Sequence, residues 1–506
     1  MRPTFEQIVD RLRQGGLLLD AVEGEMPGDT VFSDISFDNR TVRPGSLFVC
    51  KGAAFKEEYL RSALEQGALI YMSEQLYNVT APYILVSDIR LAMSSLAATF
   101  FEEGASRVKK IGITGTKGKS TVASFLNTIL DDYSLKQYSR KSALISSLRV
   151  FDGVVDMPSA LTTPEAIDLW RHLDRAGQNG MRYAVCEVSS QALKYHRVKD
   201  VSFDIALFLN IGIDHISEIE HPDFDDYFAS KLSIFSQTDK ACLFSSGDFF
   251  EEIQSKAREA GSRVFTFGYR ENDTLRLLDV TRTDRSQIFT VCYHGCRETY
   301  EIGLFGRHNI ENAMSAILAA KLLGVSNDSI RRGLAATRVA GRGVELTSQD
   351  GLLRVIVDYA HNGMSLEALY RYVENDYPDY RVITVFGCPG GKAKNRRRDM
   401  ALVSAKHSDL VILTEDDPGK ESVEDINKEI AAYLIGEGVS YLSTVDRQEA
   451  IRLALSMRFK KTVILLCGKG QENTQKRGNT AVPYETDEFF AKQELELYHS
   501  AIVPIG

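Results

Sequence analysis

The sequence lacks any apolar run long enough to cross a membrane, and its cysteines are few. No stretch approaches the roughly 18 apolar residues of a transmembrane helix, and residues 1–6 lack the apolar core of a signal peptide. The 7 cysteines are scattered over 506 residues and odd in number, which suits a reducing compartment. We therefore expect a cytoplasmic protein without membrane insertion.

An excess of positive charge is lacking as well. The chain has 60 Lys and Arg against 69 Asp and Glu, a net charge of −9. We therefore expect no nucleic-acid partner, although a local basic pocket for phosphates is compatible with this balance. Cys292 and Cys296 lie close together without zinc-site spacing or a second pair, and Gly295 between them is typical of a hairpin turn.

What is present is an alternation of strand and helix patterns. With 506 residues the chain is too long for one core, and 44% hydrophobic residues are ordinary for a globular protein. We expect an α/β protein of three domains, 1–105, 106–338 and 339–506. The first mixes short strands, such as 46–50, with a helix over 57–66.

The second and third units alternate strands with helices, which predicts mainly parallel sheets. Strands are expected in the second unit at 108–113, 183–188 and 205–209, and in the third at 354–358, 382–386, 409–413 and 462–467. Ligands of such sheets collect beyond the carboxyl ends of the strands. The candidate site segments of the third unit are therefore the turns 359–362, 387–392, 414–419 and 468–472.

The strongest local motif is the glycine-rich segment 112–121, between a strand and a helical pattern over 122–130. Glycines let successive N–H groups face phosphate oxygens, and the helix N-terminus adds positive potential there. Lys119 is expected to reach the β- and γ-phosphates and Ser120 to contact Mg²⁺. Ile113 replaces the first glycine of the general motif, so a plain strand-to-helix turn is the alternative.

A second motif is an apolar strand that ends in a carboxylate, Glu187. Hard cations take oxygen ligands, so Glu187 is a candidate Mg²⁺ ligand. The alternative is a solvated strand end without a role in binding.

These segments stand among a longer series of motifs in a fixed order along nearly the whole chain. The series comprises 115–120, 161–165, 187–191, 196–197, 210, 214–215, 221–231, 306–312, 341–342, 358–361, 416–419 and 468–472. In these residues the chain resembles the Mur ligase family, and its MurE type in particular. The resemblance implies an N-terminal uridine-nucleotide-binding domain, a central P-loop ATPase domain and a C-terminal Rossmann-like domain that binds the added amino acid.

The resemblance also implies a two-step reaction with ATP and two Mg²⁺ ions. The γ-phosphate passes to the carboxylate of UDP-MurNAc-L-Ala-D-Glu, and the amine of a diamino acid then displaces phosphate. Such chemistry needs cations between the meeting anions, a dry site and orientation. We expect a monomer that works on these two small substrates.

The resemblance assigns the ATP and metal residues. It implies catalytic or metal-associated roles for Lys119, Glu187, His215, Lys231 and Arg342, with Ser120, Glu187, His215 and Lys231 around Mg²⁺. Lys231 matches a lysine that the family carries as a carbamate, whereas lysine on a helix is ordinarily exposed. The implied ATP contacts are Gly115, Thr116, Lys117, Gly118, Lys119, Ser120, Thr121, Asn309, Asp358 and His361.

The contacts implied for the UDP substrate are less regular. They are Asn39, Thr162, Thr163, Ser189, Tyr195 and Arg197. Asn39 stands where the family usually has serine, Tyr195 replaces a common glutamine, and the expected glutamate after Arg342 is displaced by Val344 to the next position. The alternatives are a helix N-cap for the threonines and a surface ion pair for Arg197.

The residues implied for the amino acid are Lys392, Asp416, Asp417, Gly468 and Glu472. Family members that add meso-diaminopimelate carry an arginine for its extra carboxylate, and Gly419 stands in that place here. Acidic residues suit an ammonium group, so L-lysine is the first choice and ornithine the second. Residues 396–398 offer an alternative carboxylate site, but charge runs are usually solvated helix faces.

Two other functions remain as alternatives. One is a different amide ligase of the superfamily, such as a folylpolyglutamate synthetase, which lacks the N-terminal unit. The other is a catalytically silent nucleotide-binding regulator, which the presence of Lys119, Glu187 and Lys231 disfavours.

Overall fold

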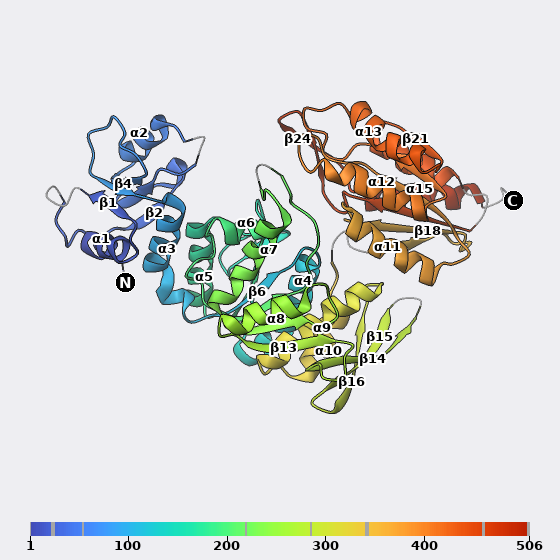
Figure 1. Cartoon of the computed structure of the whole chain (residues 1–506), viewed down its shortest axis with the longest axis horizontal. Coiled ribbons are helices and arrows are strands. Elements are labelled where there is room, and N and C mark those ends of the chain that lie inside the picture. Colours follow the sequence, from blue (N-terminus) through green and yellow to red (C-terminus); the bar gives the residue numbers. More distant parts are fainter. Residues whose placement is uncertain are drawn as a thin grey trace.

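The structure is a computed structural model that describes residues 2–21, 26–52, 55–217, 220–283, 286–339, 344–457 and 461–502, with side chains through 498. Figure 1 shows a central α/β body flanked by an N-terminal and a C-terminal one. Each body is built on its own sheet, of five, eleven and six strands. The expected α/β class and three-domain organisation are thereby confirmed. No helix in the described part of the chain is both long enough and apolar enough to cross a membrane.

The N-terminal sheet has the strand order β1-β5-β4-β3-β2, with β1 antiparallel to β5 and the other pairs parallel. Helix α1 begins at a capping box in which Thr4 and Gln7 exchange side-chain and backbone hydrogen bonds. The elements are α1 (Phe5–Gln14), β1 (Leu18–Ala21), β2 (Asp34–Ser36), η1 (Asn39–Thr41), β3 (Ser46–Val49), α2 (Glu57–Glu65), β4 (Ala68–Ser73), β5 (Tyr83–Val86) and α3 (Ile89–Ala105).

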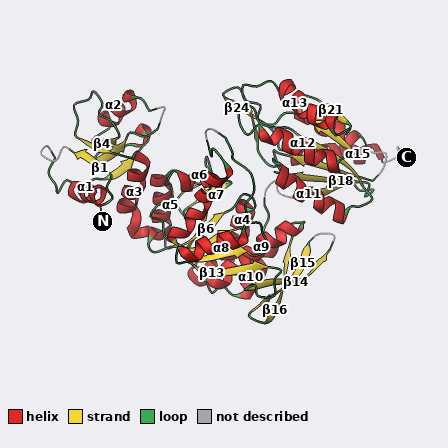
Figure 2. Ribbon diagram, viewed as in Figure 1, coloured by secondary structure: helices red, strands yellow, loops and turns green. Residues whose placement is uncertain are grey.

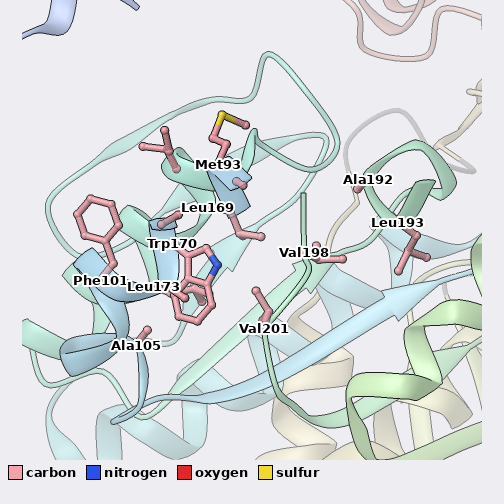
Figure 3. Packing of buried hydrophobic residues seen from close by; sticks show 14 of the residues in the cluster. Met93, Phe101, Ala105, Leu169, Trp170, Leu173, Ala192, Leu193, Val198 and Val201 are labelled. Carbon is pink, nitrogen blue, oxygen red and sulfur yellow. The ribbon is translucent and has the colours of Figure 1, made fainter. Parts of the chain in front are cut away.

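Helix α3 joins the N-terminal body to the central one by packing along α5 (Ala166–Gln178). Figure 3 shows Phe101 of α3 beside Trp170 of α5, whose ring is buried. The helices approach so closely that a Cβ on Gly177 would lie 1.9 Å from the Gly104 carbonyl oxygen. Buried aromatic rings at such contacts each contribute several kcal/mol, about 3–5 on truncation to alanine.

The central sheet places β6 between β10 and β11, all three parallel. The expected parallel core is confirmed, and antiparallel strands extend it at both edges. Its strands are β6 (Lys109–Thr114), β7 (Ala143–Ile145), β8 (Arg149–Phe151), β9 (Asp156–Pro158), β10 (Tyr183–Glu187), β11 (Phe203–Phe208), β12 (Thr238–Phe244), β13 (Arg263–Gly268), β14 (Leu275–Arg282), β15 (Gln287–Tyr293) and β16 (Cys296–Ile302). The β15–β16 connection is the hairpin turn expected at Gly295, where His294 and Gly295 both have positive φ.

Helices cover both faces of the central sheet (Figure 2). One apolar core unites the face of β6 that carries Ile111 and Ile113 with α4, α9 and α10. The other core runs beneath α5 and continues into the N-terminal body. The helices are α4 (Lys119–Tyr138), α5, α6 (Ser190–Lys194), α7 (Phe224–Leu232), η2 (Ser233–Gln237), α8 (Phe250–Glu259), α9 (Arg307–Leu322) and α10 (Asn327–Ala336).

The C-terminal sheet has the order β17-β18-β22-β19-β20-β21, parallel except for β17. All four predicted strands of this unit are present within a residue or two of their expected bounds. The elements are β17 (Val344–Thr347), β18 (Leu353–Asp358), α11 (Gly363–Asp376), β19 (Arg381–Phe386), α12 (Asn395–His407), β20 (Leu410–Leu413), α13 (Val423–Gly436), β21 (Tyr441–Ser443), α14 (Arg447–Ser456), β22 (Thr462–Cys467), β23 (Thr474–Arg477), β24 (Thr480–Pro483) and α15 (Asp487–Ile502).

Candidate active site

The phosphate loop follows β6 and ends at Gly118, the N-cap of α4. Gly118 has φ of +86°, and a Cβ there would lie 2.4 Å from Oδ1 of Asn312. Only glycine meets both the left-handed backbone and the close approach. The expected strand–loop–helix arrangement is present, and α4 begins at Lys119 and so extends beyond the predicted helix at both ends.

Asn210, two residues after the end of the neighbouring strand β11, fixes the conformation of this loop. Its Oδ1 accepts from the Lys117 backbone N–H at 2.8 Å, and its Nδ2 donates to the Lys117 carbonyl at 3.1 Å. The Thr116 hydroxyl lies 2.9 Å from the Tyr227 hydroxyl and 3.3 Å from the Gly212 carbonyl oxygen. The side chain of Thr116 therefore ties the loop to Gly212 and to Tyr227 of α7.

Two lysines from different helices converge on this loop. Lys119 Nζ donates to the Gly115 carbonyl at 2.8 Å, and Lys231 Nζ of α7 donates to the same oxygen at 3.0 Å. Lys231 is 1% exposed, against the ordinary position of lysine at a surface. Burial, and next the charge of Lys119, lowers its pKa well below the usual value. A buried, less basic amine is the form that reacts with CO₂ to give a carbamate.

Glu187 closes the other side of the loop at the end of β10. Its Oε2 accepts from the Ser120 hydroxyl at 3.1 Å, and its Oε1 accepts from the Ser147 backbone N–H at 3.1 Å. It is fully buried, and burial raises the pKa of this carboxyl despite the opposing charge of Lys119. The alternative of a solvated strand end is therefore wrong.

These residues suit a hard cation. Ser120 and Glu187 offer oxygen atoms side by side at the helix N-terminus, and a carbamate on Lys231 would add another anionic oxygen group. No cluster of three or more His, Cys, Asp and Glu with metal-binding geometry occurs in the described ranges. The two neighbouring oxygen donors of Ser120 and Glu187 fit Mg²⁺ that takes its other ligands from phosphate and water. His215 has positive φ and lies 3.2 Å from Glu220 through Nδ1.

A cavity of about 230 Å³ extends from the phosphate loop between the central and C-terminal bodies. Among the expected ATP residues, Asn309 and Asp358 line it, together with three from the loop and helix α4. The side-chain amide of Asn309 donates to the Phe305 carbonyl at 2.7 Å, and this hydrogen bond fixes the position of Asn309 in the cavity wall. The full lining is Lys117, Gly118, Thr121, Leu209, Asn210, Phe244, Phe267, His308, Asn309, Glu311, Asn312, Asp358, Met364, Ser365 and Ala368.

Asp214, quoted in the family motif but given no role from sequence, joins the two bodies. This buried carboxylate lies 3.2 Å from Lys117 Nζ, 2.8 Å from Asn362 Nδ2 and 3.3 Å from a guanidinium nitrogen of Arg396. Burial alone would raise its pKa, but Lys117, His215 and Arg396 outweigh burial and hold the pKa well below the ordinary range.

The C-terminal body also touches the phosphate loop directly. His361 Nε2 lies 3.4 Å from Lys117 Nζ. Burial lowers the pKa of Lys117 to about 8, opposed by Asp214. The contact of His361 with Lys117 is compatible with the expected position of His361 near the nucleotide.

The interpretation of 396–398 as a solvated helix face is wrong for two of its three members. Arg397 is 1% exposed and pairs with Glu421 at 2.8 Å and with Glu429. Arg396 is largely covered through its contact with Asp214. Buried guanidinium groups need carboxylate partners, and these partners lie far along the chain, where a local pattern gives no signal.

The residues expected to hold the peptide end of the UDP substrate gather at the junction of the N-terminal and central bodies. Thr163 Oγ1 donates to the Glu187 carbonyl at 2.8 Å and accepts from the Ser189 backbone N–H at 3.0 Å. Arg197 pairs with Glu165 at 2.9 Å, and Lys51 of the N-terminal body pairs with the same carboxylate at 2.6 Å.

The N-cap of α5 is Glu165, so neither threonine caps that helix, and Thr162 is half-buried beside them. Arg197 is in an ion pair, but its side chain is only 12% exposed. Ser189 caps α6. Lys51 lies in none of the motifs, so no signal in the sequence pointed to its role.

Two further expected substrate residues have other partners. Tyr195 ends α6 with its ring 4.1 Å from the guanidinium of Arg90. Asn39 lies in η1 and donates to the Ser62 hydroxyl at 3.1 Å. Arg342 lies outside the described residues.

The expected amino-acid residues meet at the carboxyl edge of the C-terminal sheet. Asp416 is buried and Asp417 follows it with positive φ. Burial raises the pKa of Asp416 to about 7, with Arg447 and Lys469 opposing. Gly468 packs so closely that a Cβ would lie 2.4 Å from Asp416 Oδ2.

A lysine that the sequence analysis left without a role sits in the middle of these acids. Lys469 is fully buried and pairs with Asp417 at 2.8 Å and Glu472 at 2.6 Å. Tyr359 also donates to Glu472 at 2.6 Å. The acids are thus arranged around an internal ammonium group, while Lys392 is exposed at the edge.

Comparisons with known proteins agree with this geometry. Family models described as Mur ligase middle domain and as Mur ligase, glutamate ligase domain match residues 113–320 and 342–470. A relative from Enterococcus faecalis, named UDP-N-acetylmuramoyl-L-alanyl-D-glutamate–L-lysine ligase, is 39% identical over 475 residues, 91% of either chain.

Solved structures share the fold at low identity. A UDP-N-acetylmuramoyl-L-alanyl-D-glutamate–2,6-diaminopimelate ligase has a TM-score of 0.66 at 21% identity, covering 99% of this chain and 100% of the other. The MurF ligase of Thermotoga maritima, in complex with ADP, has a TM-score of 0.62 at 18% identity, covering 92% and 98%. The chain belongs to the Mur ligase family.

Proposed function

We propose that the chain is the ATP-dependent ligase that joins L-lysine to the D-glutamate carboxylate of UDP-MurNAc-L-Ala-D-Glu, in peptidoglycan precursor synthesis. The observation that carries this proposal is the convergence of Lys119 and Lys231 on the Gly115 carbonyl, with Glu187 bonded to Ser120 beside them. The proposed domains are 1–105 for the UDP substrate, 106–338 for ATP and 339–506 for the amino acid. The seven cysteines are free thiols, which supports a cytoplasmic location.

The first step is phosphoryl transfer to a carboxylate. A carboxylate oxygen attacks the γ-phosphorus, the bond to the β,γ-bridging oxygen breaks, and ADP leaves with that electron pair. Lys119 and the N-terminus of α4 hold the phosphates and oppose their negative charge. Ser120, Glu187, His215 and a carbamate on Lys231 would hold the Mg²⁺ ions, which supply further positive charge between the two anions.

The second step forms the amide bond. The α-amine of lysine, once deprotonated, attacks the acyl-phosphate carbonyl, and inorganic phosphate leaves. Thr163, Ser189 and Arg197 lie next to Glu187, where they would fix the peptide end of the UDP substrate. Contacts of His361, Asn362 and Arg396 with the loop region support a C-terminal lid that carries the amine to this point.

The choice of lysine over meso-diaminopimelate rests on charge. At Gly419, where a guanidinium would pair a second carboxylate, there is no side chain, and a Cβ there would meet nothing closer than 3.9 Å. Arg477 pairs with Gly419 in a backbone bridge, but its guanidinium is bound to Glu415 at 2.6 Å. Asp416 instead presents a carboxylate that suits an ammonium group, beside Asp417 and Glu472, which Lys469 already pairs.

The test mixes purified protein, Mg-ATP and UDP-MurNAc-L-Ala-D-Glu with single amino acids, and measures phosphate release and product mass. L-Lysine should give turnover, while meso-diaminopimelate should give little and ornithine an intermediate rate. A preference for meso-diaminopimelate would overturn the lysine assignment. If no diamino acid gives phosphate release, the proposal is wrong. The chain would then be a catalytically silent nucleotide-binding protein or a ligase for another acceptor.

A further inference from the structure

Besides the phosphate loop, the nucleotide cavity has an apolar wall with one acidic group. Phe244 ends β12 and Phe267 lies in β13, and both rings line the cavity. Glu311 of α9 lines the same cavity. With the phosphates at Lys119, as the proposed function requires, these residues of the same cavity are available to meet the base of the nucleotide. None of the three has been given a role in the reaction.

Glu311 is held by a relay of hydrogen bonds on one of its two oxygens. The Tyr269 hydroxyl donates to Oε1, and Arg307 Nε donates to the Tyr269 oxygen at 3.0 Å. Within the described ranges no hydrogen bond reaches Oε2. The relay therefore fixes the orientation of the carboxyl group and leaves one oxygen for a ligand. Burial raises the pKa of Glu311, with the Tyr269 hydrogen bond and the Arg307 charge opposing.

Purine bases differ at the edge that such a group would meet. Adenine carries a 6-amino group, which donates hydrogen bonds, whereas hypoxanthine and guanine carry a 6-oxo group, which accepts them. A half-buried carboxylate oxygen satisfies the amino group but opposes the lone pairs of the oxo group. Asp358, on the C-terminal side of the cavity, remains for the ribose hydroxyls.

We propose that Glu311 is the residue that selects adenine, by accepting a hydrogen bond from the 6-amino group through Oε2 while Phe244 and Phe267 form the apolar wall beside the ring. Tyr269 and Arg307 are positioning residues that hold the carboxyl group. The proposal rests on the proposed use of ATP and adds the element that rejects 6-oxo purine nucleotides.

The test compares binding of Mg-ATP and Mg-ITP by isothermal titration calorimetry, because these nucleotides share ribose and phosphates but differ at position 6. The wild type should bind ATP about 10- to 100-fold more tightly, the range given by one hydrogen bond to a charged group. In Glu311→Gln the amide keeps an acceptor and gains a donor for the 6-oxo group. The ratio of the two dissociation constants should then fall close to one.

Controls separate this effect from misfolding. Glu259→Gln makes the same chemical change on the exposed face of α8 and should keep the wild-type ratio. Tyr269→Phe removes the hydroxyl that orients Glu311 and should lower the ratio without reversing it. Thermal melts monitored by Trp170 fluorescence verify that each variant is folded.

The outcomes are distinct. Equal affinity of the wild type for ATP and ITP, or an unchanged ratio in folded Glu311→Gln, would overturn the role of Glu311 while leaving the ligase proposal intact. Binding of neither nucleotide by the wild type would overturn the proposed function itself, and the base assignment with it.

Discussion

Lys119 and Lys231 donate to one oxygen atom, the Gly115 carbonyl, at 2.8 and 3.0 Å. Two ammonium groups so close repel each other, and burial adds to the cost of charging Lys231. An uncharged amine relieves both costs, and conversion to an anionic carbamate replaces the repulsion by attraction to Lys119. The same reaction places negative charge beside the phosphate loop, where Mg²⁺ would bind.

The first prediction concerns Lys231. Lys231→Ala should abolish turnover, by about 100-fold or more, because a group that fixes Mg²⁺ and phosphate in the transition state is lost. Acetate or bicarbonate should restore part of the rate by entering the space that the side chain leaves. Phosphate release with and without the added acid measures both effects.

The control for this experiment is Lys256→Ala, at an exposed lysine of α8, which should retain the wild-type rate and show no response to acetate. Full activity in Lys231→Ala would remove the carbamate from the mechanism. If Lys231→Ala is folded but inactive and added acid restores no activity, the role of Lys231 is structural only.

The second prediction concerns Glu187. Glu187→Gln preserves shape and a hydrogen bond to Ser120 but removes the negative charge that the metal requires. The rate should fall about 100-fold or more, and the Mg²⁺ concentration for half-maximal activity should rise. Glu259→Gln serves as the matched control. A Mg²⁺ dependence equal to that of the wild type would exclude Glu187 as a ligand.

The third prediction concerns pH. The pKa of Asp416 is raised to about 7 by burial, so the carboxyl is protonated below this pH and ionised above it. In the proposed function the lysine ammonium would bind the ionised form, and its affinity should therefore fall as pH drops below 7, by up to about tenfold per unit. The Michaelis constant for L-lysine, measured from pH 6 to 8.5, tests this.

Asp416→Asn should flatten this profile and weaken lysine binding at pH 8, with ATP binding as the internal control. A wild-type Michaelis constant that is flat from pH 6 to 8.5 would contradict the assignment of Asp416 to the ammonium group.

The phosphate loop was predictable because strand, glycines, lysine and helix are contiguous, and so were the four parallel strands of the C-terminal sheet. Lys469 lies inside the motif 468–472, yet its ion pair is with Asp417, 52 residues earlier. Periodicity and spacing carry no information about such pairs.

The same limit applies at the junctions. Lys51 meets Glu165 and Asp214 meets Arg396 only after whole bodies have packed together. Local pattern also misjudged 396–398, because a buried arginine and a solvated one have the same sequence signature until their partners are known. The site was therefore predictable in its ATP half and much less so where the bodies join.

The fourth prediction concerns Gly468. It has φ of +109°, and a Cβ would lie 2.4 Å from Asp416 Oδ2. Gly468→Ala should displace that carboxylate and raise the Michaelis constant for lysine about tenfold or more, while ATP affinity stays unchanged. Gly438→Ala is the matched control, since Gly438 also has positive φ but no atom within 4 Å of a Cβ. An equal rise of the Michaelis constant in both variants would mean that backbone strain is the cause, and that the contact with Asp416 is not.

The fifth prediction concerns the link between the lid and the phosphate loop. Asp214 binds Lys117 from the loop and Arg396 from the lid, so charge on this carboxylate holds the two together. Asp214→Asn should lower the rate because two half-buried cations lose their buried partner, at a cost of at most about 3–5 kcal/mol. Arg396→Gln should weaken only the lid side.

A double-mutant cycle isolates that contact. If Asp214 and Arg396 act through each other, the sum of the two single-variant losses should exceed the loss of the double variant, by a coupling energy of about 0.5–3 kcal/mol. Small-angle scattering with Mg-ATP should show a larger radius of gyration for both single variants as the C-terminal body moves away. Strictly additive losses with unchanged scattering would mean that the ion pair does not hold the lid, and that Asp214 acts on Lys117 alone.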